Sequence, residues 1–272
     1  MVFYPPAWLP AIPEDLSAFG TVGDFVLGGE SELPSSPSRD ESPVLVSAQG
    51  DRSKTAGQLV RDVEDLAAAL AQNLKWSPNE SDDQGDRVIA ILSENTVRTT
   101  SILMIQYARD RKRRKKKRPQ TNKVPKLEYL TCCWAIHRIG ATCLLLHGST
   151  TPEENGAHIK RSRCRVLIAS PSLLQSGQAA MAAAGVSDPV FYLNGTTSAT
   201  NGHGTQPQLK TVEELMTAGS SRDRLPVMVE RGGERVAYLC PTSGTSGLQV
   251  LYFLPYFISP FASSHQSPQG GR

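Results

Sequence analysis

Short apolar runs alternate with segments of helical periodicity along most of this 272-residue chain. Strands that alternate with helices are typical of a parallel sheet, because each helix carries the chain back across a face of the sheet. The pattern therefore predicts an α/β fold with a largely parallel sheet and flanking helices. The expected strands are residues 43–48, 87–92, 141–147, 165–170, 190–194 and 235–240.

Threonines mark the starts of three expected helices. Thr55 and Thr211 each precede a Gln or Glu by three residues, the spacing of a capping box. Thr151 is followed by Pro152 and two glutamates, which favour the first turn of a helix. The helix after Thr55 has one apolar face, and its acidic residues are predicted to lie on a solvated face. That apolar face consists of Leu59, Val63, Leu66, Leu70 and Leu74. Two further helices are expected over residues 127–140 and 172–185.

The alternation is interrupted after the strand at 87–92, where about thirty residues precede the next helix although such loops usually have about 2–6. Residues 98–126 hold twelve Lys or Arg and one acid. Their local charge of +11 leaves −8 for the rest of the chain, against a net charge of +3. Removing this segment closes a strand–helix–strand unit. We interpret residues 98–126 as a basic insertion that like-charge repulsion keeps solvated and disordered.

A nuclear-import or nucleic-acid-binding tract is the alternative for this segment, because the eight consecutive basic residues Arg111–Arg118 would be attracted to phosphate. Against it, Tyr107 alone supplies an aromatic ring among the charges, and no nucleic-acid-binding fold is recognisable around them. Nucleic acid is therefore not an expected partner.

The composition indicates the cellular compartment of the protein. Five cysteines, an odd number without metal-ligand spacing, favour a reduced intracellular protein. The pattern of a signal peptide is missing, and no apolar stretch approaches the ~18 residues of a membrane helix. We expect a cytoplasmic protein without a membrane span, with nuclear entry through the basic run as an alternative. Residues 1–40, rich in Pro and Ser, are interpreted as an irregular arm.

Other candidate chemistry is weaker. Cys132 and Cys133 are interpreted as core residues of a helix. Cys240, at the end of the last expected strand, is either a buried strand-end residue or a reactive thiol. The histidines at 137, 147 and 158 lack the spacing of a metal site, so no metal ligand is assigned.

The stretch PTSGTSG at 241–247 follows the last expected strand directly. Glycines allow the backbone to approach a ligand closely, and free N–H groups with four hydroxyls form a cradle for phosphate. The G-x-x-x-x-G-K-[ST] pattern of a P-loop is missing. A Ser/Gly cluster by itself is also typical of a flexible turn. The candidate cofactor-binding residues are Thr242, Ser243, Gly244, Thr245, Ser246 and Gly247.

The sequence AYLCPTSGTSGLQ resembles the phosphate-binding signature of the adenylate-forming enzymes, the AMP-dependent synthetases and ligases. Among them it is most similar to acyl-CoA ligases and 4-coumarate–CoA ligase. The upstream strands and helices resemble the family in order and spacing once residues 98–126 are removed. The resemblance implies that residues 41–249 are a partial AMP-binding domain, the N-terminal part of the family's larger domain.

The resemblance also implies a reaction. A carboxylic acid attacks the α-phosphorus of ATP and releases pyrophosphate, and the thiol of coenzyme A then displaces AMP from the acyl-adenylate. The implied cofactors are ATP, Mg²⁺ and coenzyme A, and the implied partner is a small-molecule carboxylic acid. Residues 242–247 would hold the ATP phosphates, and no residue of this chain is assigned as catalytic.

The chain departs from the family pattern after the loop. Gln249 and Val250 stand where the family has a proline and a lysine. Residues 250–272 lack helical periodicity and are predicted to be a disordered tail outside the family. The family's adenine- and ribose-binding segments and small C-terminal domain have no counterpart. We therefore expect a truncated, inactive form of an acid–CoA ligase, and a peroxisomal location only for a full-length relative. The alternative is a non-catalytic nucleotide-binding remnant or a basic interaction protein.

Overall fold

The structure is a computed structural model. It describes residues 21, 43–46, 53–80, 86–93, 128–194, 209–226 and 235–241, together with the backbone of 251–255. Its centre is a six-stranded sheet with the strand order β6-β5-β3-β4-β7-β8. The five strands from β6 to β7 are parallel, which confirms the predicted α/β class. The six strands of the sheet are β3 (Val88–Ser93), β4 (Thr142–His147), β5 (Val166–Ala169), β6 (Val190–Leu193), β7 (Val236–Pro241) and β8 (Leu251–Pro255).

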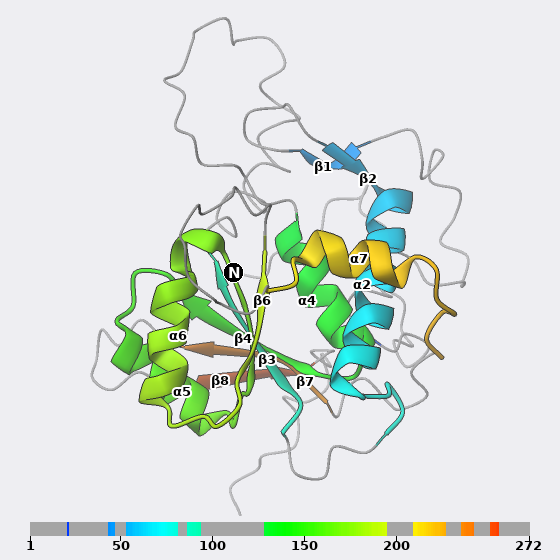
Figure 1. Cartoon of the computed structure of the whole chain (residues 1–272). Coiled ribbons are helices and arrows are strands. Elements are labelled where there is room, and N and C mark those ends of the chain that lie inside the picture. Colours follow the sequence, from blue (N-terminus) through cyan, green and yellow to red (C-terminus); the bar gives the residue numbers. More distant parts are fainter. Residues whose placement is uncertain are drawn as a thin grey trace, which may run out of the picture.

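Helices cover both faces of this sheet (Figure 1). On one face α2 packs against α4 and α7, and on the other α5 packs against α6. Alternate residues of β3 enter the two resulting cores, Ile89 and Ile91 on the α2 side and Ala90 and Leu92 on the α5 side. The helices are α2 (Ala56–Leu74), α4 (Glu128–Arg138), α5 (Pro152–Arg161), α6 (Leu174–Ala183) and α7 (Val212–Gly219), with a single 3₁₀ turn, η1 (Pro171–Leu173), before α6.

The predicted helix starts are confirmed. The hydroxyls of Thr55, Thr151 and Thr211 each accept the N–H three residues on, and the side chain there accepts the threonine N–H in return. The apolar face of α2 is also confirmed, since Leu59, Val63, Leu66 and Leu70 are buried and Leu74 is partly buried. Local sequence was sufficient here because a cap involves residues only three apart.

Two strands lie apart from the main sheet. β1 (Pro43–Val46), which was predicted, pairs with β2 (Ser53–Thr55), which was not, in a separate antiparallel sheet at the start of α2. Figure 1 shows this pair beyond the N-terminal end of α2.

The close packing of α7 on α2 depends on a glycine. A Cβ at Gly219 would lie 1.8 Å from the main-chain oxygen of Asp65, so only a residue without a side chain permits this approach.

The predicted disordered tail is wrong for residues 251–255. They form β8, which pairs antiparallel with β7 from Val236 with Pro255 to Pro241 with Leu251. The apolar sequence LYFLP lacks helical periodicity, as predicted, but it is compatible with an edge strand whose proline stands at one end. Residues 98–126 and 256–272 lie outside the described residues.

Candidate phosphate-binding edge

The predicted phosphate loop joins two neighbouring strands. β7 ends at Pro241, β8 begins at Leu251, and these two residues are opposite each other in the ladder. The connection between them contains all six candidate residues, 242–247, which lie outside the described residues. Because β3 to β7 are parallel, the loop begins at the carboxyl edge of the sheet. Ligands of open α/β sheets bind at this edge.

Two side chains hold the first half of β7. The hydroxyl of Thr142 donates to the Val236 carbonyl at 2.9 Å, and Nε2 of His137 lies 3.0 Å from the Ala237 carbonyl. A carbonyl oxygen only accepts, so Nε2 is the nitrogen that carries the proton. Burial lowers the pKa of His137 to about 3, and the ring is therefore neutral at ordinary pH.

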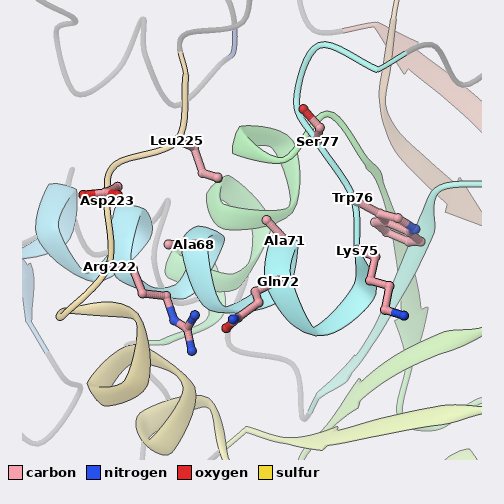
Figure 2. Close-up of a pocket in the computed structure, with 9 residues that line it drawn as sticks. All are labelled: Ala68, Ala71, Gln72, Lys75, Trp76, Ser77, Arg222, Asp223 and Leu225. Carbon is pink, nitrogen blue, oxygen red and sulfur yellow. The ribbon is translucent and has the colours of Figure 1, made fainter.

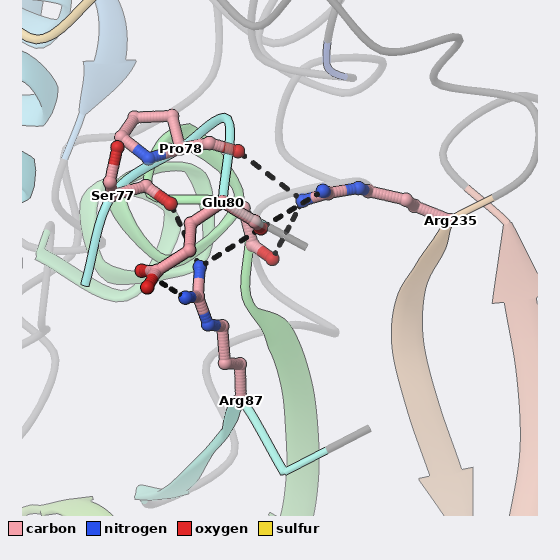
Figure 3. Close-up of polar contacts among 6 residues, drawn as sticks. Ser77, Pro78, Glu80, Arg87 and Arg235 are labelled. Carbon is pink, nitrogen blue, oxygen red and sulfur yellow. Dashed lines mark hydrogen bonds and ion pairs between the residues drawn. The ribbon is translucent and has the colours of Figure 1, made fainter. Parts of the chain in front are cut away.

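Two arginines join the amino edge of the sheet to the connection between α2 and β3 (Figure 3). Arg87 pairs with the carboxylate of Glu80 and donates to the main-chain oxygens of Ser77 at 2.8 Å and Glu80 at 3.3 Å. Arg235, one residue before β7, donates to the oxygens of Gly140 at 3.2 Å and Pro78 at 3.4 Å. Arginine suits this position because its fixed fork of donors can satisfy several carbonyls at once.

Arg138 makes a third connection, at the last residue of α4. Its Nε donates to the Glu64 carboxylate of α2 at 2.7 Å. Its two remaining nitrogens donate to the main-chain oxygens of Leu225 and Pro226, each at 2.7 Å. The prediction of a solvated acidic face on α2 is therefore wrong for Glu64, whose side chain is 21% exposed and paired. Its partner lies 74 residues away, beyond the reach of pattern reasoning.

At the carboxyl edge of the sheet, several polar side chains at the ends of the strands are buried. Ser93, Ser170 and Asn194 follow or end the neighbouring strands β3, β5 and β6, and all three are buried. Their backbones continue the ladder, since Ser170 N–H donates to the Leu92 oxygen and Asn194 N–H to the Ala169 oxygen. Within the described residues, the Ser93 hydroxyl and both polar atoms of the Asn194 side chain have no partner. Sequence reasoning did not single out these residues, although a polar residue directly after an apolar run was visible.

The cysteines are core residues or strand-end residues. Cys132 and Cys133 are buried as predicted, and the Cys133 and Cys143 sulfurs are 4.0 Å apart. Burial raises the pKa of the half-buried Cys240, with the neighbouring Cys133 as a smaller cause, so its thiol stays protonated. This favours the strand-end interpretation over a reactive thiolate.

Across the described ranges, no group of three or more His, Cys, Asp or Glu residues could hold a metal ion. No helix in those ranges is sufficiently long and apolar to cross a bilayer.

A surface hollow of about 420 Å³ lies elsewhere, between the end of α2 and the segment after α7. Figure 2 shows Gln72, Lys75 and Trp76 on the α2 side and Arg222 and Leu225 on the other. Its described lining residues belong to α2, to the segment directly after α2 and to the segment after α7.

Comparison with known proteins shows a sequence similarity along nearly the whole chain. Acyl-CoA ligase easD of Emericella nidulans is 33% identical over 264 residues, which cover 94% of this chain. Acyl-CoA ligase cm3C of Cordyceps militaris is 30% identical over 264 residues, with the same coverage of this chain. The chain is similar to these acyl-CoA ligases over nearly all of its length. The resemblance predicted from its loop is confirmed.

The similarity covers only part of the length of these relatives. The chain spans about 40% of the length of the curated relatives it matches, 40% of easD and 38% of cm3C. No family model matches it. The anthranilate CoA ligase AuaEII, solved with anthranoyl-AMP, has a TM-score of 0.58 at 15% identity over 88% of this chain and 35% of that chain. The fold is therefore that of part of an adenylate-forming ligase.

Proposed function

We propose that residues 242–247 bind the phosphates of ATP, and that the chain is the phosphate-binding part of an acid–CoA ligase. The observation that carries the proposal is the position of the loop, which begins where β7 ends at the carboxyl edge of a parallel sheet. The acyl-CoA ligases among its relatives support the reaction class. The substrate would be a small carboxylic acid, activated as its acyl-adenylate and transferred to coenzyme A.

The loop suits this role chemically. Its N–H groups and four hydroxyls can donate to phosphate oxygens, and its glycines allow close approach. Mg²⁺ would enter with ATP, because magnesium in such sites keeps several waters and binds substrate phosphates through few protein oxygens. The hydroxyl oxygens of the loop fit that donor set. No carboxylate of this chain is assigned to the ion.

We further propose that these 272 residues alone bind ATP but do not form acyl-adenylate. They span about 40% of the length of the relatives named above, and Val250 stands where the family has a lysine. Removing a single preorganised donor to a developing charge commonly lowers the rate about 10²–10³-fold. Positioning of the acid would be lost in addition.

The proposal is tested with the purified 272-residue chain. ATP affinity is measured by calorimetry, and acyl-adenylate formation by acid-dependent exchange of pyrophosphate into ATP. We expect weak ATP binding that Gly244→Val and Thr245→Val abolish and that Ser149→Ala, at the neighbouring end of β4, leaves unchanged. Unchanged binding in both loop variants would refute the loop assignment. Acid-dependent exchange of pyrophosphate into ATP by the parent chain would refute the proposal that these 272 residues alone do not form acyl-adenylate.

A second function is favoured by one observation, the +11 charge of residues 98–126. A protein that neutralises Z phosphates loses affinity with a log–log salt slope of about −0.9Z on duplex DNA. If this segment is an interaction tract, the chain will bind DNA with a steep salt dependence that disappears when Arg111–Arg118 are replaced by Ser and Gly. Equal binding by both chains would exclude it.

A further inference from the structure

The two halves of β7 are held by different means. Within the described residues, the ladder between β4 and β7 consists of Cys143 with Tyr238 and Leu144 with Leu239. Val236 precedes this ladder, and its carbonyl accepts the hydroxyl of Thr142 instead. On its β4 side the strand is thus paired through the backbone at Tyr238 and Leu239 and through the Thr142 side chain at Val236, whereas on its β8 side Val236 pairs with Pro255.

Ala237 lies at an irregular point of the strand. The register between β7 and β8 shifts between Val236 and Tyr238, so the regular antiparallel pairing does not continue through Ala237. The Ala237 carbonyl accepts a hydrogen bond from Nε2 of His137, on α4. A side chain therefore satisfies a main-chain oxygen at the point where the ladder is disturbed.

His137 is a suitable residue for this bond. It is fully buried and neutral, so it introduces no charge into the interior. Its ring also stands edge-on to Tyr238, with centroids 4.6 Å apart and planes at 81°. One side chain thus contacts two successive residues of β7. Edge-to-face contact is one of the favourable arrangements of two aromatic rings.

We propose that His137, together with Thr142, is a positioning residue for the phosphate loop. These bonds set the height of β7 along β4, and β7 ends directly before Thr242. A strand rises about 3.3 Å per residue, so even a partial slip would displace the loop. A misplacement of about 1 Å can lower the rate of a reaction about 10²-fold. The inference rests on the proposed function, because it is the ATP-binding role that makes the position of the loop matter.

The test uses the full 272-residue chain. It compares substitutions that remove a hydrogen-bond donor to β7 with substitutions at the same positions that keep one. His137→Phe keeps a ring beside Tyr238 but removes the N–H, whereas His137→Gln keeps an N–H donor. Thr142→Val removes the hydroxyl at constant shape, whereas Thr142→Ser keeps it. Ser162→Ala is the structural control, because it removes a buried hydroxyl that donates to the Ile159 oxygen, away from β7.

The readouts are the Kd for ATP and backbone hydrogen exchange. We expect His137→Phe and Thr142→Val to weaken ATP binding by about three- to tenfold, the loss of about one hydrogen bond. We expect His137→Gln, Thr142→Ser and Ser162→Ala to bind as the parent does. Exchange at residues 238–240 should rise in the two donor-deletion variants while exchange in β5 stays constant. If His137→Phe does not fold, Thr142→Val decides alone.

Two outcomes separate the inference from the function on which it rests. Parent-like ATP affinity and parent-like exchange at 238–240 in folded donor-deletion variants would overturn the positioning role. A parent chain that binds no ATP would refute the proposed function instead. In that case the exchange data still decide whether these side chains hold β7.

Discussion

The two edges of the parallel sheet differ in whether their described polar groups have hydrogen-bond partners. At the amino edge, Arg87 and Arg235 bond to main-chain oxygens of the α2–β3 connection and of the turn before β4. At the carboxyl edge, Ser93 and Asn194 are buried with polar side-chain atoms that lack a partner in the described part of the chain. Among the described residues, arginines at the amino edge bond to main-chain carbonyls, whereas Ser93 and Asn194 at the carboxyl edge keep unused hydrogen-bonding atoms.

This difference separates stability from ligand binding. Satisfied buried groups stabilise a fold, and unsatisfied ones destabilise it by about 1–3 kcal/mol each. Natural proteins depart from such rules mainly at functional sites. The edge with the unused groups is also the edge from which the predicted phosphate loop begins. We therefore expect substitutions at the amino edge to lower stability, and substitutions at the carboxyl edge to have little effect on it.

The largest effect is expected at Arg138, whose guanidinium joins Glu64 to the carbonyls of Leu225 and Pro226. Arg138→Met should lower the free energy of unfolding by about 3 kcal/mol, the lower end for breaking a buried pair, because Glu64 is partly exposed. Urea denaturation measures this loss. Glu64→Gln, which keeps an acceptor oxygen, is the control and should cost less. A loss below about 1 kcal/mol in Arg138→Met would mean that this connection contributes little.

The next effect concerns Gly140, in the turn before β4. Its φ is +73°, and a Cβ there would lie 2.6 Å from Nη1 of Arg235 and 2.8 Å from the Pro78 oxygen. Gly140→Ala should destabilise the chain by about 2 kcal/mol through backbone strain and displacement of Arg235. The matched control is Gly185→Ala, where φ is +70° and no atom lies within 4 Å of the added carbon. Equal losses in the two variants would show that the Arg235 contact is unimportant.

A further effect, which is absent at neutral pH and grows only as the pH falls, depends on His137. Burial lowers the pKa of this ring in the folded state to about 3, below its unfolded value of about 6.5. The unfolded chain therefore binds the proton first, and the stability present above pH 6.5 is lost as the pH falls toward 3. The slope is about 1.4 kcal/mol per pH unit.

Urea denaturation between pH 4 and pH 8 measures this slope. The difference between the parent and His137→Gln isolates the contribution of this residue, and His147→Gln, at an exposed ring, is the control. A parallel pH dependence in the parent and His137→Gln would contradict the buried neutral ring.

The smallest effect is expected at the carboxyl edge. Ser93→Ala removes a buried hydroxyl that has no partner within the described residues, so stability should stay constant or rise by up to about 1 kcal/mol. Ser162→Ala, which removes a hydroxyl that donates to the Ile159 oxygen, should cost about 1 kcal/mol. Thermal unfolding compares the two. A larger loss at Ser93 would mean that its hydroxyl is satisfied in solution, and the contrast between the edges would be smaller than we infer.

Local patterns predicted much of this fold. The caps at Thr55, Thr151 and Thr211 involve neighbours three residues apart, and the buried strands are apolar on both faces. The pairing of β3 with β4 confirms that the strand–helix–strand unit closes across the basic segment. The loop at 242–247 led to the family, although its conformation and the proposed ligand remain predictions.

Partners that are distant in sequence could not be predicted. Residues 251–255 were expected to be disordered, because nothing in LYFLP indicates that β7 would present a free edge to it. No sequence pattern indicated that Glu64 would pair with Arg138. None indicated that the Ala237 carbonyl would accept a hydrogen bond from His137, 100 residues before it. These contacts depend on where α4 lies over the sheet.

The sequence alone determined the periodicity of each segment, the residues at which helices begin, and a loop chemistry suited to phosphate. Each of these depends on neighbours within a few residues, so a linear pattern contains the information. The tertiary structure decided which strand edge accepts β8, which carbonyls the arginines satisfy, and that His137 holds the strand leading to the loop. Burial and hydrogen bonding between distant residues exist only once the elements pack, because packing determines which polar groups lose water and must find a partner in the protein.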